Sequence, residues 1–171
     1  KTNMPLPVGS FLQPSSLGEE KIFSLIKPHI KNKRILELYA GLGTFTCRMQ
    51  PDAIHITAID FASEAIFKLK QQCLPKVNTI EQNLEMDPVE TEVVNNYELV
   101  VLDPPRSGAK NQCLKISKSK VNKIIYISCN IESFARDSKI LIDGGYKIKV
   151  LTGIDQFIYT HHLEIVTIFY K

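Results

Sequence analysis

The two residues of this chain best suited to covalent chemistry are a cysteine and a glutamate, each placed at the end of an apolar run. Cys129 follows the apolar stretch 124–128 and precedes the polar residue Asn130. A thiol at the carboxyl end of a parallel strand lies in the crevice where α/β proteins bind ligands, and there it can attack an electrophilic ring. Cysteines at strand ends are also often buried and inert, so both interpretations stay open.

Glu164 enters the last apolar run of the chain, with hydrophobic residues on either side. Burial raises the pKa of a carboxyl group, and a raised pKa suits that group to proton transfer. The alternative is a charge that protects an edge strand from pairing with another chain. Glu164 is therefore a candidate general base.

The segment from Asp103 to Gly108 (Asp-Pro-Pro-Arg-Ser-Gly) directly follows another apolar run. Its two prolines lack a backbone donor and fix φ, so the segment can neither continue a strand nor begin a helix cleanly. We predict a rigid loop at the rim of the sheet, in which Asp103 and Arg106 suit a nucleotide site. A purely structural turn is the alternative.

A candidate cofactor loop begins at Glu37 and contains Gly41 and Gly43. The two glycines allow a sharp turn and the close approach of a ligand. A carboxylate at the strand end favours a cationic or hydroxylated ligand over a pyrophosphate, and Asp60, which ends the next apolar run, is placed to bond ribose hydroxyls. Each acid alone could equally be a helix cap or a surface charge. Together these residues predict an adenosyl ligand with a cationic end, such as S-adenosylmethionine.

Apolar runs that alternate with helical stretches must position these groups, a pattern typical of βα units and a parallel sheet. The predicted strands are residues 34–38, 54–60, 77–82, 98–102, 123–128, 146–151 and 165–170. The predicted helices are residues 19–27, 44–50, 62–74, 110–118 and 132–143. No helical periodicity separates the last two strands, so they should pair antiparallel. The prediction is an α/β fold with a seven-stranded, mostly parallel sheet, an antiparallel C-terminal hairpin and helices on both faces.

The bulk composition narrows the function classes. The 171 residues suit one domain, and the net charge of +3 permits a nucleic-acid partner without demanding one. None of the four cysteines forms a CxxC pair, which argues against a structural zinc site and fits a cytoplasmic protein. The adjacent His161 and His162 would point to opposite faces of a strand, so no metal is predicted.

No apolar run reaches about 18 residues, so no membrane span is expected. The start at Lys1 suggests a piece of a longer chain.

Several segments together resemble the catalytic domain of the RNA 5-methyluridine (uracil-C5) methyltransferases, which act on tRNA or ribosomal RNA. The matching segments are residues 11–13, 37–45, 81–85, 103–108, 126–130 with 134–137, and 155–164. The Ser-Cys-Asn and His-His-Leu-Glu motifs are specific, whereas unrelated methyltransferases share the glycine loop. The resemblance implies a Rossmann-like class I methyltransferase fold. Residues 1–18 are then expected to form an extended lead-in and residues 19–171 the catalytic domain, without the accessory RNA-binding domains of many members.

By this resemblance, Cys129 would be the nucleophile that adds to C6 of uracil and Glu164 the general base. Asp103 and Arg106 would orient the base. The resemblance further implies an S-adenosylmethionine site lined by Gln13, Tyr39, Thr44, Asp60, Asn83 and Asp103. The expected product is 5-methyluridine in an RNA substrate.

Two other functions remain open at this point. Amino-group methylation of a base or a protein side chain would explain the Asp-Pro-Pro loop but would leave Cys129 and Glu164 unused. A non-catalytic domain that binds S-adenosylmethionine or RNA in support of a partner is the third possibility.

Overall fold

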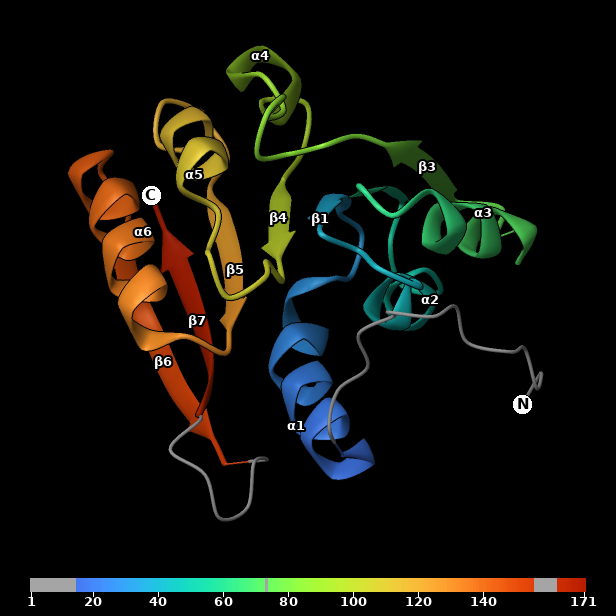
Figure 1. Cartoon of the computed structure of the whole chain (residues 1–171), viewed down its shortest axis with the longest axis horizontal. Helices are drawn as coiled ribbons and strands as arrows, with labels where there is room; N and C mark the ends of the chain where they lie inside the picture. The colour runs from blue at the N-terminus through green and yellow to red at the C-terminus, as the bar shows by residue number, and fades with distance from the viewer. Residues whose placement is uncertain (1–14, 73, 156–162) are drawn as a thin grey trace.

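A seven-stranded sheet lies between two layers of helices in a computed structural model of the chain, which describes residues 15–72, 74–155 and 163–171 (Figure 1). The strands are β1 (Arg34–Leu38), β2 (His55–Asp60), β3 (Val77–Glu81), β4 (Leu99–Leu102), β5 (Lys123–Ser128), β6 (Lys147–Ile154) and β7 (Glu164–Tyr170). Their order across the sheet is β3-β2-β1-β4-β5-β7-β6. The first five are parallel, and β7 is antiparallel to both of its neighbours. The predicted sheet and its antiparallel C-terminal hairpin are confirmed.

Helices cover both faces of the sheet, as predicted. They are α1 (Ser16–Ile26), η1 (Lys27–His29), α2 (Thr44–Met49), α3 (Ser63–Gln71), α4 (Thr91–Val94), α5 (Lys110–Ile116) and α6 (Ile131–Asp143). Residues of α1, α2 and α3 form one hydrophobic core with one face of the strands. Residues of α4, α5 and α6 form a second core on the other face. Strand side chains such as Ile35 and Leu36 alternate between the two cores, which explains why the strands read as continuous apolar runs.

The structure differs from the sequence prediction at several element ends. Helix α1 begins at Ser16 rather than at Glu19, because the Ser15 hydroxyl accepts a hydrogen bond from the Gly18 N–H and caps the helix earlier. Strand β6 continues to Ile154, where it still pairs with β7. The single-turn helix α4 was not predicted, because four residues are too short to show a period.

Three carboxylates are buried in the described part of the chain, and each lies near a loop of the predicted site. Glu37 is on β1, Asp137 on α6 and Glu164 at the start of β7. A buried charge is stable only when it is paired or hydrogen-bonded, or when the group takes up a proton. Burying these three acids therefore costs free energy, which their hydrogen bonds or a bound proton must offset. Among the described helices, none combines the length and the apolar character needed to cross a membrane.

Candidate active site

The predicted site residues lie in a row along one edge of the sheet. Leu38 of β1 pairs with Ile59 of β2 on one side and with Leu102 of β4 on the other, and Ser128 of β5 pairs with Ile165 of β7. The carboxyl ends of the four parallel strands and the start of β7 therefore meet at the same edge. In strand order, the site residues at this edge are Asp60, Tyr39, Asp103, Cys129 and Glu164.

The glycine loop takes backbone conformations that few side chains tolerate. Gly41 and Gly43 have φ values of 55° and 82°, and Tyr39 has a φ of 64°. A Cβ on Gly43 would collide with the side chain of Leu69 on α3, so that glycine lets the loop pack against the helix. A Cβ on Gly41 would meet no atom of the described residues within 4 Å. Open space beside Gly41 is what a ligand approaching the loop requires.

Glu37 is buried (3% exposed) and accepts a hydrogen bond of 2.5 Å from the Thr46 hydroxyl of α2. Burial raises the pKa of Glu37 to about 8, and the charges of Asp103 and Asp60 raise it further, although the Thr46 hydrogen bond opposes this. A carboxyl group poised near neutrality ionises readily when a cation comes close. No motif in the sequence pointed to Thr46.

Asp60 bonds the backbone of the cofactor loop and the backbone of the connection that leads from β2 into α3. One carboxylate oxygen accepts from the Gly41 N–H at 2.8 Å, and the other accepts from the N–H of Ala62, the N-cap of α3, at 2.8 Å. The cap interpretation of this acid is therefore correct in part. A carboxylate oxygen can accept more than one hydrogen bond, so the proposed contact with ribose hydroxyls is still available to Asp60.

Asn83 shapes the loop that follows β3. Its side-chain oxygen accepts hydrogen bonds from the N–H groups of Glu85 at 3.1 Å and Met86 at 3.2 Å, which closes a tight turn. Asn111 of α5 donates a hydrogen bond of 2.7 Å to the Glu85 carbonyl. Thr44, another residue expected to line the cofactor site, is the first residue of α2 and is half-buried.

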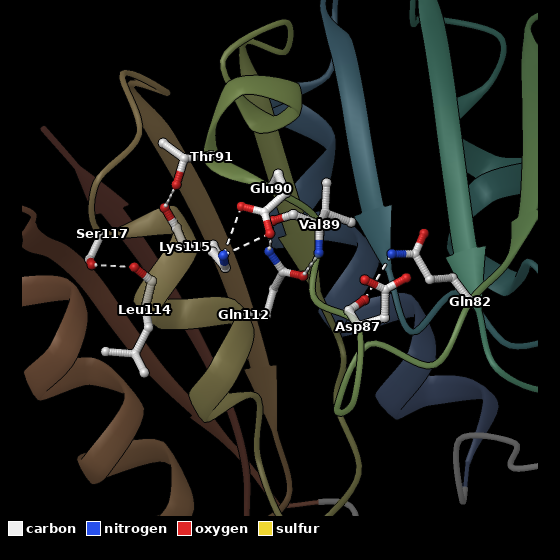
Figure 2. A network of polar contacts seen from close by, with 9 residues as sticks. All are labelled: Gln82, Asp87, Val89, Glu90, Thr91, Gln112, Leu114, Lys115 and Ser117. Atoms are coloured by element: carbon white, nitrogen blue, oxygen red, sulfur yellow. Dashed lines mark hydrogen bonds and ion pairs between the residues drawn. The ribbon is translucent and has the colours of Figure 1, made fainter.

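Helix α5 also holds the connection between the Asn83 turn and β4 (Figure 2). The buried Gln112 side chain accepts from the Val89 N–H at 2.8 Å and donates to the Val89 carbonyl at 3.1 Å. Lys115 pairs with Glu90 at 2.7 Å (Figure 2). Because α5 directly follows the Asp103–Gly108 loop, these contacts give the Asn83 turn and that loop a common support.

Cys129 lies half-buried in a turn that leads from β5 into α6. The Ser128 hydroxyl donates to the Asn130 carbonyl at 3.1 Å and accepts from the Asn130 N–H at 3.2 Å. The Asn130 side chain in turn caps α6 by accepting from the Ser133 N–H at 2.8 Å. The polar neighbours of Cys129 therefore fix the backbone of the turn that carries it.

The four predicted catalytic residues influence one another electrostatically. Burial raises the pKa of the Cys129 thiol, the charges of Glu164 and Asp103 raise it further, and Arg106 opposes this. Burial also raises the pKa of Asp103 to about 7, with a smaller contribution from Glu164. The structure thus brings Cys129, Glu164, Asp103 and Arg106 together, and burial and the two carboxylates disfavour the thiolate. Their catalytic roles remain predictions.

Sequence analysis assigned no role to Asp137, which is fully buried on α6 (0% exposed). The Asp137 carboxylate accepts from the Tyr126 hydroxyl at 2.7 Å and from the Ala109 N–H at 2.6 Å. The signal was an acid in the apolar stripe of a predicted helix, between Phe134 and Leu141. Two other predictions, the role of Gln13 and the His161-His162 pair, fall outside the described residues.

Comparison with known proteins connects this edge to a family. The family model described as tRNA (Uracil-5-)-methyltransferase matches residues 89–171. An uncharacterized RNA methyltransferase of Brucella melitensis is 39% identical, covering 100% of this chain and 42% of the relative. Another from Caldanaerobacter subterraneus is 36% identical over 95% of this chain and 37% of the relative. The chain thus spans less than half the length of these curated relatives.

One solved structure is similar in both sequence and fold. The Pyrococcus abyssi tRNA (uracil-54, C5)-methyltransferase, in complex with S-adenosyl-L-homocysteine, superposes with a TM-score of 0.80 at 26% identity, covering 94% of this chain and 40% of that one. The fold and the edge site define a class I, S-adenosylmethionine-dependent methyltransferase domain. Within that class, the chain is similar to the RNA uracil-C5 methyltransferases.

The residues at this edge fit S-adenosylmethionine. Glu37 offers an acid whose ionised form a cationic amino group would stabilise, and Asp60 offers acceptors for ribose hydroxyls. The open space beside Gly41 leaves room for the ligand to approach the loop. The glycine loop and these two acids would therefore hold the cofactor, next to Asp103.

Proposed function

We propose that this domain methylates C5 of a uridine in RNA through a transient covalent bond between Cys129 and C6 of the base. The observation that carries the proposal is the convergence of Cys129, Glu164, Asp103 and Arg106 at the sheet edge that also holds the cofactor loop. A thiol beside two carboxylates and a guanidinium is a chemical set that a simple binding domain would not need.

The proposed reaction begins when the Cys129 thiol loses its proton to water and the thiolate adds to C6 of uracil. The electron pair of the C5=C6 bond moves onto C5 and the C4 carbonyl, and Arg106, which is exposed on the loop, is placed to balance the negative charge. S-adenosylmethionine held by the glycine loop would supply the electrophilic methyl group that C5 takes up, and would leave as S-adenosylhomocysteine.

Glu164 completes the proposed cycle. Its carboxylate removes the proton from C5, the C5=C6 bond forms again, and the C6–S bond breaks to release the Cys129 thiolate. The proton then passes from Glu164 to water. The base must leave any stacked arrangement to reach the sulfur, so the RNA substrate is expected to present a flipped or unpaired uridine.

Replacing Cys129 with alanine in the whole protein tests this proposal. The expected result is loss of uridine methylation with retained binding of S-adenosylhomocysteine. The same variant should form no denaturation-resistant complex with RNA containing 5-fluorouridine, whereas the unaltered protein should form one. Methylation that survives in Cys129→Ala would instead favour methylation of an amino group, the reaction that the Asp-Pro-Pro loop alone would support. Transcripts of tRNA and ribosomal RNA, analysed by nucleoside mass spectrometry, would then identify the substrate.

A further inference from the structure

The buried carboxylate of Asp137 joins three separate parts of the fold. It accepts from the Tyr126 hydroxyl of β5 at 2.7 Å and from the backbone N–H of Ala109, at the end of the Asp103–Gly108 loop, at 2.6 Å. Arg136 on its own helix donates to it at 2.9 Å through Nε and forms an ion pair with it at 2.8 Å through Nη2. Removing one partner of a buried carboxylate leaves its charge uncompensated and destabilises the fold. Each of these contacts is therefore maintained together with the others.

The Asp103–Gly108 loop is pressed against this group. Arg136 Nη2 donates a hydrogen bond of 2.8 Å to the Ser107 carbonyl. Gly108 has a φ of 79°, and a Cβ there would lie 2.5 Å from Asp137 Oδ2 and 2.6 Å from Arg136 Nη2. The Gly108 N–H donates back to the Pro105 carbonyl at 2.8 Å. Position 108 can therefore hold only glycine, because a larger residue would collide with the ion pair of Asp137 and Arg136.

Helix α6, which carries Asp137, also adjoins the turn that holds Cys129. Helix α6 starts directly after Asn130, which caps it and neighbours Cys129. Tyr126, which bonds Asp137, lies on the strand that ends just before the cysteine turn. The position of the sulfur relative to the Asp103–Gly108 loop thus depends on the pairing of β4 with β5 and on a second path through α6, which Asp137 closes.

We propose that Asp137 is a positioning residue, which sets the Asp103–Gly108 loop relative to Cys129 so that a base held by the loop presents C6 to the sulfur. This inference rests on the proposed function. Asp137 is itself fully buried and has no route to RNA or cofactor, so it acts through the Ala109 and Tyr126 contacts. Reacting groups must meet within a narrow range of distance, and a displacement of about 1 Å can reduce the rate about 10²-fold.

The test is Asp137→Asn in the whole protein. Asparagine keeps the shape but only one acceptor oxygen, so its amide donors would face either the Arg136 guanidinium or the Ala109 N–H and Tyr126 hydroxyl, and the group can no longer accept from all three partners. The rate of covalent complex formation at saturating 5-fluorouridine RNA should fall about 10²-fold. The Kd for S-adenosylhomocysteine and the RNA concentration at half-saturation should stay within a few-fold. A general structural defect would instead change all three together.

Two further variants sharpen this test. Tyr126→Phe removes one donor to the carboxylate and should produce a smaller rate loss of the same kind. Ser138→Ala is the matched control, because Ser138 follows Asp137 on the buried face and its hydroxyl has no hydrogen-bond partner in the described structure. Ser138→Ala should react at the unaltered rate. An unchanged rate in Asp137→Asn, or a rate loss in Ser138→Ala as large as in Asp137→Asn, would overturn the proposal.

Hydrogen exchange separates this inference from the proposed function. The Ala109 amide should exchange faster in Asp137→Asn than in the unaltered protein, whether or not any RNA reacts. If the unaltered protein forms no covalent complex and methylates no uridine, the proposed function fails while the exchange result still tests the loop anchor. Unchanged exchange at Ala109 would reject the positioning role of Asp137.

Discussion

Glu164, at the start of β7, raises the pKa of the Cys129 thiol, at the end of the neighbouring strand β5. The charge of Glu164, the proposed base, therefore disfavours the thiolate of Cys129, the proposed nucleophile, while no substrate is bound. The conflict ends if RNA binding brings an electrophilic ring and its carbonyl groups to the thiol, with Arg106 as the compensating charge. Such an arrangement keeps a reactive thiolate from forming before a substrate is present.

We predict that Glu164→Gln lowers the pKa of Cys129, because it removes a negative charge that disfavours the thiolate. Alkylation of Cys129 by iodoacetamide, followed peptide by peptide with mass spectrometry, should reach its half-maximal rate at a lower pH in this variant. Arg106→Gln should shift the same profile to higher pH, because the guanidinium favours the thiolate. Identical profiles for all three proteins would show that these charges do not act on the sulfur.

The same Glu164→Gln substitution should trap the reaction after methyl transfer. Glutamine cannot accept the C5 proton, so the methylated base should stay bonded to Cys129 and a covalent RNA–protein complex should accumulate on denaturing gels. Cys129→Ala combined with Glu164→Gln is the control and should yield no such band. Normal turnover of uridine by Glu164→Gln would reject its role as the base.

Glu37 should make the stability of the protein depend on pH. Its pKa is about 8 in the folded protein, against 4.5 ordinarily, so between these values the folded state holds a proton that the unfolded state releases. The contribution of Glu37 to stability should therefore decline as pH rises from about 4.5 to 8. Urea unfolding should show that Glu37→Gln gains stability relative to the unaltered protein as pH increases from 5 to 9.

A companion variant tests the origin of the Glu37 effect. Thr46→Val removes the hydroxyl that favours the ionised carboxyl, so the pKa of Glu37 should rise further and the decline of stability should extend to higher pH. If the free energy of unfolding of Glu37→Gln changed with pH in the same way as that of the unaltered protein, the raised pKa would not belong to Glu37.

The sequence predicted the sheet well because its strands are buried on both faces. Residues 34–38 and 123–128, for example, were located to the residue as β1 and β5, since their apolar runs end abruptly at polar loop residues. The antiparallel hairpin followed from the lack of helical periodicity between β6 and β7. The early start of α1 escaped prediction, because it depends on the capping hydrogen bond of Ser15.

The strands and strand ends that bring the predicted site residues to one edge of the sheet followed from the sequence, whereas the electrostatic interactions between these residues did not. Cys129 and Glu164 lie far apart in sequence, and only the β5–β7 pairing makes the charge of one act on the other. Asp137 lies in the 134–137 segment of the resemblance but received no role, because its partners Tyr126 and Ala109 come from two other segments. Pairwise contacts between distant segments follow from packing, which periodicity alone does not specify.

The two glycines of the cofactor loop should respond differently to alanine. Both have positive φ, where an L-residue loses about 1–2 kcal/mol. Gly43→Ala should destabilise the protein more, because its Cβ must also displace the Leu69 side chain of α3, whereas the Cβ of Gly41→Ala would enter open space. Urea unfolding should therefore rank Gly43→Ala below Gly41→Ala in stability.

Binding measurements on the same two variants test whether the open space beside Gly41 belongs to the cofactor. If it does, Gly41→Ala should weaken S-adenosylhomocysteine binding by at least 10-fold, about 1.4 kcal/mol, while the protein stays folded. Isothermal titration calorimetry below the unfolding transition provides the affinity, and Gly145→Ala serves as the control. That glycine also has a positive φ, of 95°, but it lies after α6 and before β6, away from the site edge. Equal affinity in Gly41→Ala and Gly145→Ala would place the ligand elsewhere, because both substitutions put an L-residue at positive φ but only the methyl group at position 41 would enter the proposed ligand space.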